Sequence, residues 1–262
     1  PFFIAEYLRL AIGERILRRG PTGVWAMHVA AESPTALRAA LPLPGGMRDL
    51  VRRRFEQLGH DARALVQIAT VLGREMDAEV LFEAAGLDRA GAAALQELRA
   101  REILEESERG GLRFGHDKVR EVIYDEIPES RRPGMHLRAA RAIEARHGQG
   151  PDRALHYAVL AHHYGHAAAF EKTLEYLEKA GEHALHAATS ADARRFFERA
   201  LQLEAEGRGR GLAGQGEGKR ARWQRLLGEA CYNLGDLGSA RLHLQHCLDS
   251  LEPAGTKVLT SS

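Results

Sequence analysis

Small and large apolar residues recur at matching places in the second half of the chain, and this repetition constrains the fold more than any other feature. Ala193, Phe197 and Ala200 stand in one helical pattern, and Ala240 and Leu244 stand in a later one. Ala193 and Ala240 lie 47 positions apart. A period of about 20–50 residues is typical of helix pairs that stack and bury one continuous core. The pattern therefore predicts stacked helices in this half of the chain.

The same residues fit the tetratricopeptide pattern, in which small residues stand where paired helices touch. The best matches are Leu227, Gly228, Gly235, Ala240, Leu244 and Pro253, and weaker ones are Leu160, Ala161, Tyr164, Leu177 and Ala180. A regular repeat of this kind is about 34 residues long, so the observed spacing indicates an irregular array. The residues beyond a regular repeat are assigned to a Gly-rich, charged segment at 207–218, and we expect a flexible loop near 206–219.

The first half of the chain reads as helices interrupted by short strands. An amphipathic helix is predicted over Phe2–Arg19, a strand around 24–27, and a Pro- and Gly-rich boundary at 41–46. Helices then follow at 47–58, 61–72, 78–85 and 88–99, strands near 103–105 and 112–114, and a helix at 117–127. Helices followed by a β-hairpin are the pattern of a winged-helix domain. The fold class is therefore predicted as mainly α, with a winged-helix domain at 42–127 and TPR-like helical repeats (a solenoid) at 128–262.

The second half is predicted to be helical from about residue 130 onward. Its helices are expected at 134–146, 153–166, 170–186, 191–205, 222–233 and 237–251.

A predicted strand ends and a predicted helix begins at Phe114-Gly115-His116-Asp117. We predict Asp117 as the cap of the new helix. The start of a helix collects unpaired N–H groups, which suit phosphate oxygens, and a neighbouring His116 could sense the charge of a phosphate. The other interpretation is a histidine buried where the strand meets the helix. The chain has no phosphate-binding loop of the form G-x-x-x-x-G-K-[ST].

Together these features resemble the STAND class of signal-transduction ATPases, which includes bacterial MalT-like and predicted AAA-type regulators. Residues 1–8, PFFIAEYL, look like the end of the Gly-x-Pro motif in the ATPase lid, and residues 114–121, FGHDKVRE, look like the Met-His-Asp motif of the winged-helix domain. Residues 122–137 resemble the junction at which helical repeats follow the winged helix. The resemblance covers nearly the whole chain, although Gly115 stands where the eukaryotic motif has Met.

The resemblance implies a role for three residues and for residues 1–41, which would be the end of the ATPase lid. Pro1 would lie against the adenine, and His116, beside Asp117, would approach the β-phosphate of ADP and hold the closed state. These nucleotide contacts can form only in a longer parent protein, which would bind ATP or ADP, because this segment itself is expected to hold no cofactor.

The implied function is a regulatory segment that couples the nucleotide state of an upstream NTPase domain in cis to inducer sensing by the repeats. The inducer would be a protein or a small molecule, and the parent a cytoplasmic, nucleotide-dependent oligomer. The parent would be an ATPase fused to a Ser/Thr kinase, a nucleotide cyclase or a DNA-binding domain. No catalytic motif stands in this segment, so it is predicted not to be an enzyme. The alternatives are a DNA-binding winged-helix regulator with a helical sensor and a stand-alone repeat scaffold.

Composition limits the classes of partner that the chain is expected to bind. The 37 basic and 36 acidic residues give a net charge of +1, which predicts no binding to nucleic acid or to an anionic membrane. Cys231 and Cys247 lie in helical patterns and are interpreted as buried thiols in a reducing compartment. His162, His163 and His166 invite comparison with metal ligands, but no Asp, Glu or Cys stands at a suitable spacing. No metal site is therefore predicted.

Overall fold

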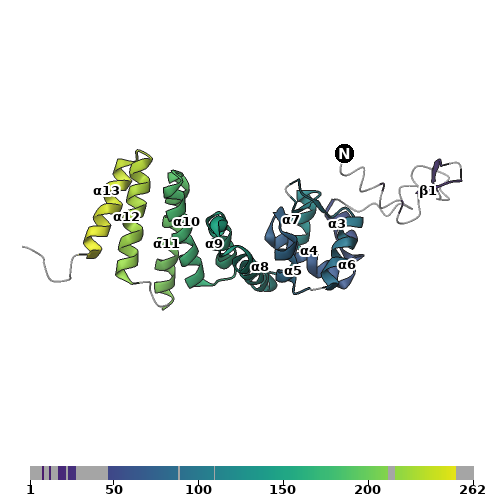
Figure 1. Ribbon diagram of the computed structural model, residues 1–262, viewed down its shortest axis with the longest axis horizontal. Coiled ribbons are helices and arrows are strands. Elements are labelled where there is room, and N and C mark those ends of the chain that lie inside the picture. Colours follow the sequence, from purple (N-terminus) through teal and green to yellow (C-terminus); the bar gives the residue numbers. More distant parts are fainter. Residues whose placement is uncertain are drawn as a thin grey trace, which may run out of the picture. The chain divides into compact units, whose positions relative to one another are not determined.

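The computed structural model describes residues 8, 12, 17–21, 23–27, 47–87, 89–108, 110–211 and 216–251. They are mainly helical, with two small antiparallel sheets (Figure 1). The predicted mainly helical class is confirmed. The chain divides into two compact units, one of residues 1–78 and 85–128 and the other of residues 79–84 and 129–262. The domain identities given to residues 1–41, 42–127 and 128–262 remain predictions.

Two short strands lie near the start of the first unit. β1 (Leu17–Arg19) pairs antiparallel with β2 (Trp25–Met27). The helix predicted over 2–19 is therefore wrong at residues 17–19. Leu8 and Ile12 are helical, and the other residues of that prediction lie outside the described ones. The reason is the turn between the strands, where Gly20 N donates to Val24 O at 2.9 Å and Gly23 has a φ of 80°. Glycine permits that φ without strain, which favours a hairpin.

The rest of the first unit packs helices beside a three-stranded sheet. The buried side of α4, with Leu65 and Val66, packs against α6 and α7. The sheet has the order β3-β5-β4, so the predicted β-hairpin gains a third strand. β3 has two residues, too few to show the alternation that identifies a strand in a sequence. The elements are α3 (Met47–Glu56), α4 (His60–Leu72), β3 (Glu75–Met76), α6 (Arg89–Ala100), β4 (Leu104–Glu106), β5 (Leu112–Phe114) and α7 (Asp117–Asp125). Between β3 and α6 in the sequence stands α5 (Ala78–Ala85), whose residues 79–84 belong to the second unit.

The second unit consists of helices that each pack against the next one along the chain. They are η1 (Glu129–Arg131), α8 (Arg132–His147), η2 (Pro151–His156), α9 (Tyr157–His166), α10 (Phe170–His186), α11 (Ser190–Gly209), α12 (Glu217–Asn233) and α13 (Leu237–Leu251). The loop predicted near 206–219 is helical at both ends, because α11 continues to Gly209 and α12 begins at Glu217. Gly207 is buried against Phe170, which accounts for the extra turn of α11.

The same backbone turn joins three of these helix pairs. Its middle residue has a positive φ, 54° at Ala168, 57° at Ala188 and 77° at Gly235. In each turn the next N–H donates to a carbonyl five residues earlier: Ala169 to Tyr164 at 3.0 Å, Thr189 to Ala184 at 2.9 Å and Asp236 to Cys231 at 3.0 Å. This is the left-handed helix ending that satisfies otherwise unpaired carbonyls.

The same small-against-large contact holds two of the pairs together. A Cβ at Gly181 would lie 2.6 Å from Phe197 Cζ, and one at Gly228 would lie 2.8 Å from Leu244 Cγ. Phe197 follows Gly181, and Leu244 follows Gly228, by the same 16 positions. The two contacts are 47 positions apart along the chain, as are the turn residues Ala188 and Gly235. The spacing seen in the sequence therefore corresponds to a recurring local structure.

The turn at Ala188 gives a first test. Ala188→Gly is expected to raise the free energy of unfolding by about 0.5–1 kcal/mol, because relief of left-handed strain exceeds the entropy gained by the unfolded chain. Ala187, with a φ of −83°, is the matched control, and Ala187→Gly should lower the same quantity by about 0.5–1 kcal/mol. Urea denaturation followed by circular dichroism measures both. Equal losses from the two changes would contradict the left-handed turn.

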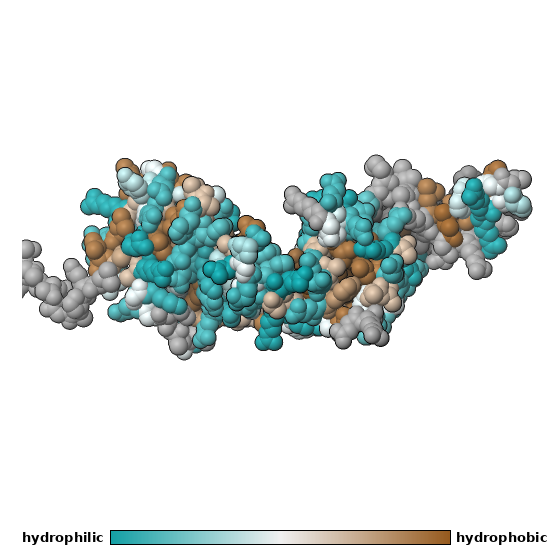
Figure 2. All heavy atoms as spheres, viewed as in Figure 1, coloured by the Kyte–Doolittle hydropathy of each residue, from teal (hydrophilic) through white to brown (hydrophobic). Residues whose placement is uncertain are grey.

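The helices of the described ranges include none that is both long and apolar enough to cross a bilayer. The end of the second unit nevertheless carries exposed apolar side chains (Figure 2). On α13 they are Leu237, Leu242, Leu244 and Leu248.

Candidate functional site

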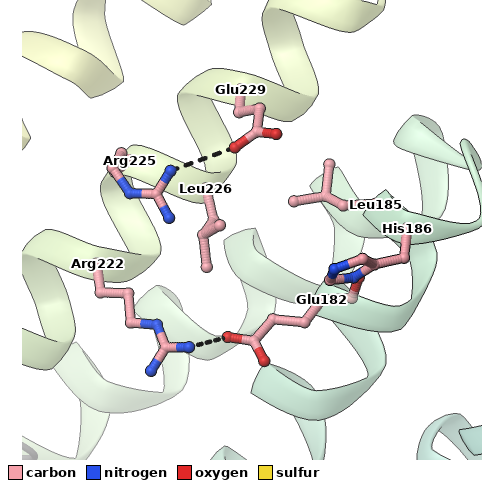
Figure 3. A pocket seen from close by; sticks show the side chains of 7 residues that line it. All are labelled: Glu182, Leu185, His186, Arg222, Arg225, Leu226 and Glu229. Atoms are coloured by element: carbon pink, nitrogen blue, oxygen red, sulfur yellow. Dashed lines mark hydrogen bonds and ion pairs between the residues drawn. The ribbon is translucent and has the colours of Figure 1, made fainter.

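A pocket of about 330 Å³ lies between α10 and α12 (Figure 3). Both helices belong to the second unit and pack on α11. Leu226 is almost fully buried at 7% exposure and forms part of the apolar wall with Leu185. The other lining residues are Glu182, His186, Arg222, Arg225 and Glu229. The pocket thus combines an apolar wall with charges of both signs.

Arginine–glutamate pairs surround the pocket. Arg222 on α12 reaches across to α10, where its Nη2 lies 2.5 Å from Glu182 Oε1 and its Nη1 lies 3.3 Å from Glu178 Oε1. Within α12, Arg225 Nη1 lies 3.3 Å from Glu229 Oε2. The side chains of Arg222 and Arg225 are 54% and 53% exposed. The Arg225–Glu229 pair is about half exposed on both sides, and exposed pairs of this kind contribute about 0–1 kcal/mol, so a ligand can replace this pair at small cost. The carboxylates that pair with Arg222 are less exposed, 13% at Glu178 and 30% at Glu182.

The lining residues can bind a ligand through charge and apolar contact. None of them is a Ser, Thr or Cys that a base could activate. His186 Nδ1 lies 2.7 Å from Glu182 O, so that nitrogen carries the proton and donates it to the backbone. The arrangement can recognise a short segment that offers an apolar side chain together with a positive and a negative group.

The structure places His116 at the surface, as the residue that precedes α7. The alternative of a buried histidine at this junction is therefore wrong. Val119 N donates to His116 O at 3.1 Å, so the backbone of His116 begins the helix.

Asp117 is the first residue of α7 rather than its cap. His116, with extended backbone angles, occupies the cap position, and no side chain caps this helix. The Asp117 carboxylate instead faces Arg74, with Oδ1 and Nε 3.3 Å apart, because a carboxylate in the first turn is attracted by a nearby cation. Pro1 lies outside the described residues.

The three histidines weighed as metal ligands all lie on α9, with His163 buried and His162 and His166 exposed. His163 contacts His136 of α8, and the two Nδ1 atoms are 3.0 Å apart. Burial, followed by repulsion from neighbouring histidines, lowers the pKa of His163 to about 3 and that of His136 to about 4. Both rings are therefore neutral at neutral pH.

A second polar cluster, which the sequence did not reveal, surrounds Glu144 of α8. Its carboxylate accepts hydrogen bonds from Tyr164 of α9, from Tyr176 of α10 at 2.6 Å and from Lys172 of α10 at 2.8 Å. Burial alone would raise the pKa of Glu144, but the hydrogen bonds from Lys172, Tyr164 and Tyr176 lower it to about 2. The partners come from two other helices, so no short window of the sequence indicates them. The cluster fastens α8, α9 and α10 to one another.

Comparison with known proteins finds a weak likeness among solved structures. No protein-family model and no curated protein matches the chain. Among solved structures, it is similar to a Signal Transduction ATPase with Numerous Domains (STAND) protein with a tetratricopeptide repeat sensor from Pyrococcus horikoshii, at 15% identity and a TM-score of 0.40. The match covers 79% of this chain and 34% of that one, so this chain spans about a third of its length. At this TM-score we draw no conclusion on fold or function from the likeness.

Proposed function

We propose that residues 129–251 form a tetratricopeptide-like domain that binds a partner, within a regulatory protein in which the preceding unit is a winged-helix domain. The observation that carries the proposal is the recurrence of one local structure. The left-handed turn and the contact of glycine with a large side chain return together after 47 positions. Stacked helix pairs of this kind leave a surface along which a partner can lie.

The pocket between α10 and α12 sets the chemistry of that partner. Its leucines favour an apolar side chain, and its half-exposed arginines and glutamates favour flanking charges of opposite sign. The same charges exclude a partner that would place a positive group on the arginines or a negative group on the glutamates, because like charges repel. We therefore propose a short peptide segment with mixed charge as the ligand.

Peptides selected from a displayed random library against the 262-residue chain would test this. Each selected peptide is titrated by fluorescence anisotropy. Arg225→Glu should weaken binding at least about tenfold, since it reverses one charge of the pocket wall. The control is Arg195→Glu on α11, whose side chain is 73% exposed and pairs with Asp192. Peptides that bind Arg225→Glu as tightly as the unaltered chain would contradict the pocket as the binding site.

We further propose that the chain is the C-terminal part of a STAND-type switch, and that His116 senses the nucleotide held by an upstream NTPase domain. The exposure of His116 at the start of α7 supports this, because a phosphate could approach the ring there. On this proposal the parent protein binds ATP or ADP, and the segment contributes no catalytic residue.

ADP retention by the full-length parent is the decisive measurement for this second proposal. His116→Ala should release bound ADP faster than the unaltered protein by about tenfold, the loss expected for one charge-assisted hydrogen bond. His60→Ala, at the exposed first residue of α4, serves as the control. Unchanged ADP release from correctly folded His116→Ala would remove the sensor role.

A further inference from the structure

Four histidines gather where α8 and α9 pack together in the second unit. His136 comes from α8, and His162, His163 and His166 come from α9. The His136 ring centroid lies 5.8 Å from that of His162, 5.2 Å from that of His163 and 4.6 Å from that of His166, on which it stacks. Sequence spacing concealed this cluster, because His136 precedes His163 by 27 positions and belongs to another helix.

The nitrogen atoms of three of these rings are close enough to share one ion. One ligand nitrogen from each of His136, His162 and His163 lies within 4.8 Å of the other two. Two nitrogens bound to one tetrahedral zinc ion, each at about 2.0–2.1 Å, are about 3.3 Å apart. The Nδ1 atoms of His136 and His163 are already 3.0 Å apart. The third nitrogen, from His162, lies within 4.8 Å of one nitrogen of each of the other two rings.

The surroundings suit a metal that prefers nitrogen ligands. His136 and His163 are each 2% exposed, whereas His162 is exposed, so an ion could enter from the side of His162. Neutral imidazole is the form that binds a metal ion. Mg²⁺ and Ca²⁺ prefer oxygen ligands, so a site made of imidazole nitrogens disfavours them.

We propose that His136, His162 and His163 bind a divalent transition metal of the zinc class, with the fourth position open to water. Three histidines and one open position are a known ligand set for zinc. The ion would join α8 to α9 at the beginning of the helical array. This proposal is independent of the peptide pocket and of the nucleotide switch.

Zinc titration of the tag-free, chelator-treated chain tests the proposal. Isothermal titration should show one equivalent of Zn²⁺ bound, and excess Mg²⁺ should not displace it. Co²⁺ bound in the same place should give the strong visible absorption of a four-coordinate site. His162→Ala should weaken Zn²⁺ binding at least about tenfold, since it removes one of three protein ligands.

Two further variants make the result decisive. His136→Ala alters a buried residue, so its fold is checked by circular dichroism, whereas the exposed His162 can be changed without that risk. His183→Ala, at an exposed histidine of α10, should leave Zn²⁺ binding unchanged. Failure to bind Zn²⁺, or equal affinity in His162→Ala and in the unaltered chain, would overturn the proposal.

Discussion

Phe197→Ala is expected to lower the free energy of unfolding of the second unit by about 3–5 kcal/mol, the usual cost of removing a large buried aromatic side chain. Phe197 is 0% exposed, and its ring lies directly over Gly181 of the neighbouring helix. The loss combines the transfer of the ring to water with the cavity left between α10 and α11. Urea denaturation followed by circular dichroism measures it.

A double-mutant cycle shows whether the contact with Gly181 is the cause. Gly181→Ala alone should cost about 1–3 kcal/mol, because the new methyl would overlap a ring that has no room to move. In the Phe197→Ala background the same change should stabilise the chain, since the room is then present and alanine favours a helix. Gly218→Ala in α12, where the added atom meets nothing within 4 Å, should be stabilising in either background. Additive losses from the first two changes would contradict the packing of Phe197 on Gly181.

Glu144→Gln should produce the second large effect, a loss of about 1–3 kcal/mol in the free energy of unfolding. The amide keeps the shape of the side chain but removes the negative charge that accepts hydrogen bonds from Lys172, Tyr164 and Tyr176. Because these partners lie on α9 and α10, three helices lose a common anchor. Glu229→Gln, at an exposed carboxylate of α12, is the matched control and should cost little.

The pH dependence of the same variant gives an independent check. The pKa of Glu144 is lowered from 4.5 to about 2 in the folded chain, so its charge stabilises the fold fully above pH 4.5. That contribution is lost as the pH falls from about 4.5 towards 2, because the unfolded chain then binds the proton first. The stability difference between the unaltered chain and Glu144→Gln should shrink over that interval. A difference that is constant from pH 7 to about pH 2 would show that the charge does not contribute.

Local patterns were sufficient to place many of the helices. The predicted bounds of Phe170–His186 and Leu237–Leu251 agree with the structure, and each helix begins directly after a three-residue turn that the sequence pattern marks. The 47-residue spacing could also be predicted, because the small residues that mark it, such as Ala193 and Ala240, stand at matching places in two helical patterns. The error at residues 17–19 arose because the helix was extended to the stop signal at Gly20-Pro21, whereas pairing with residues 25–27 makes Leu17, Arg18 and Arg19 a strand.

The parts of the candidate sites that could not be predicted are side-chain contacts between distant helices. His136 meets His163 across 27 positions, Tyr176 meets Glu144 across 32, and Arg222 meets Glu182 across 40. Each partner is an ordinary polar residue in its own helix. Only the packing of the helices gives these residues their partners, and that packing is not encoded in any short window of the sequence.

The left-handed turns at Ala168 and Ala188 stand at the two ends of α10, and this helix packs on both α9 and α11. If α10 were lost together with α9, the apolar side of α11 would be exposed, and if it were lost together with α11, that of α9 would be exposed. Gain or loss of helix pairs during evolution is therefore restricted in α9–α11. Such changes meet less resistance at the junction between Gly209 and Glu217, where the connection from α11 to α12 is longer than the three-residue turns that join α9 to α10, α10 to α11 and α12 to α13. Length variation among descendants of this chain should concentrate there.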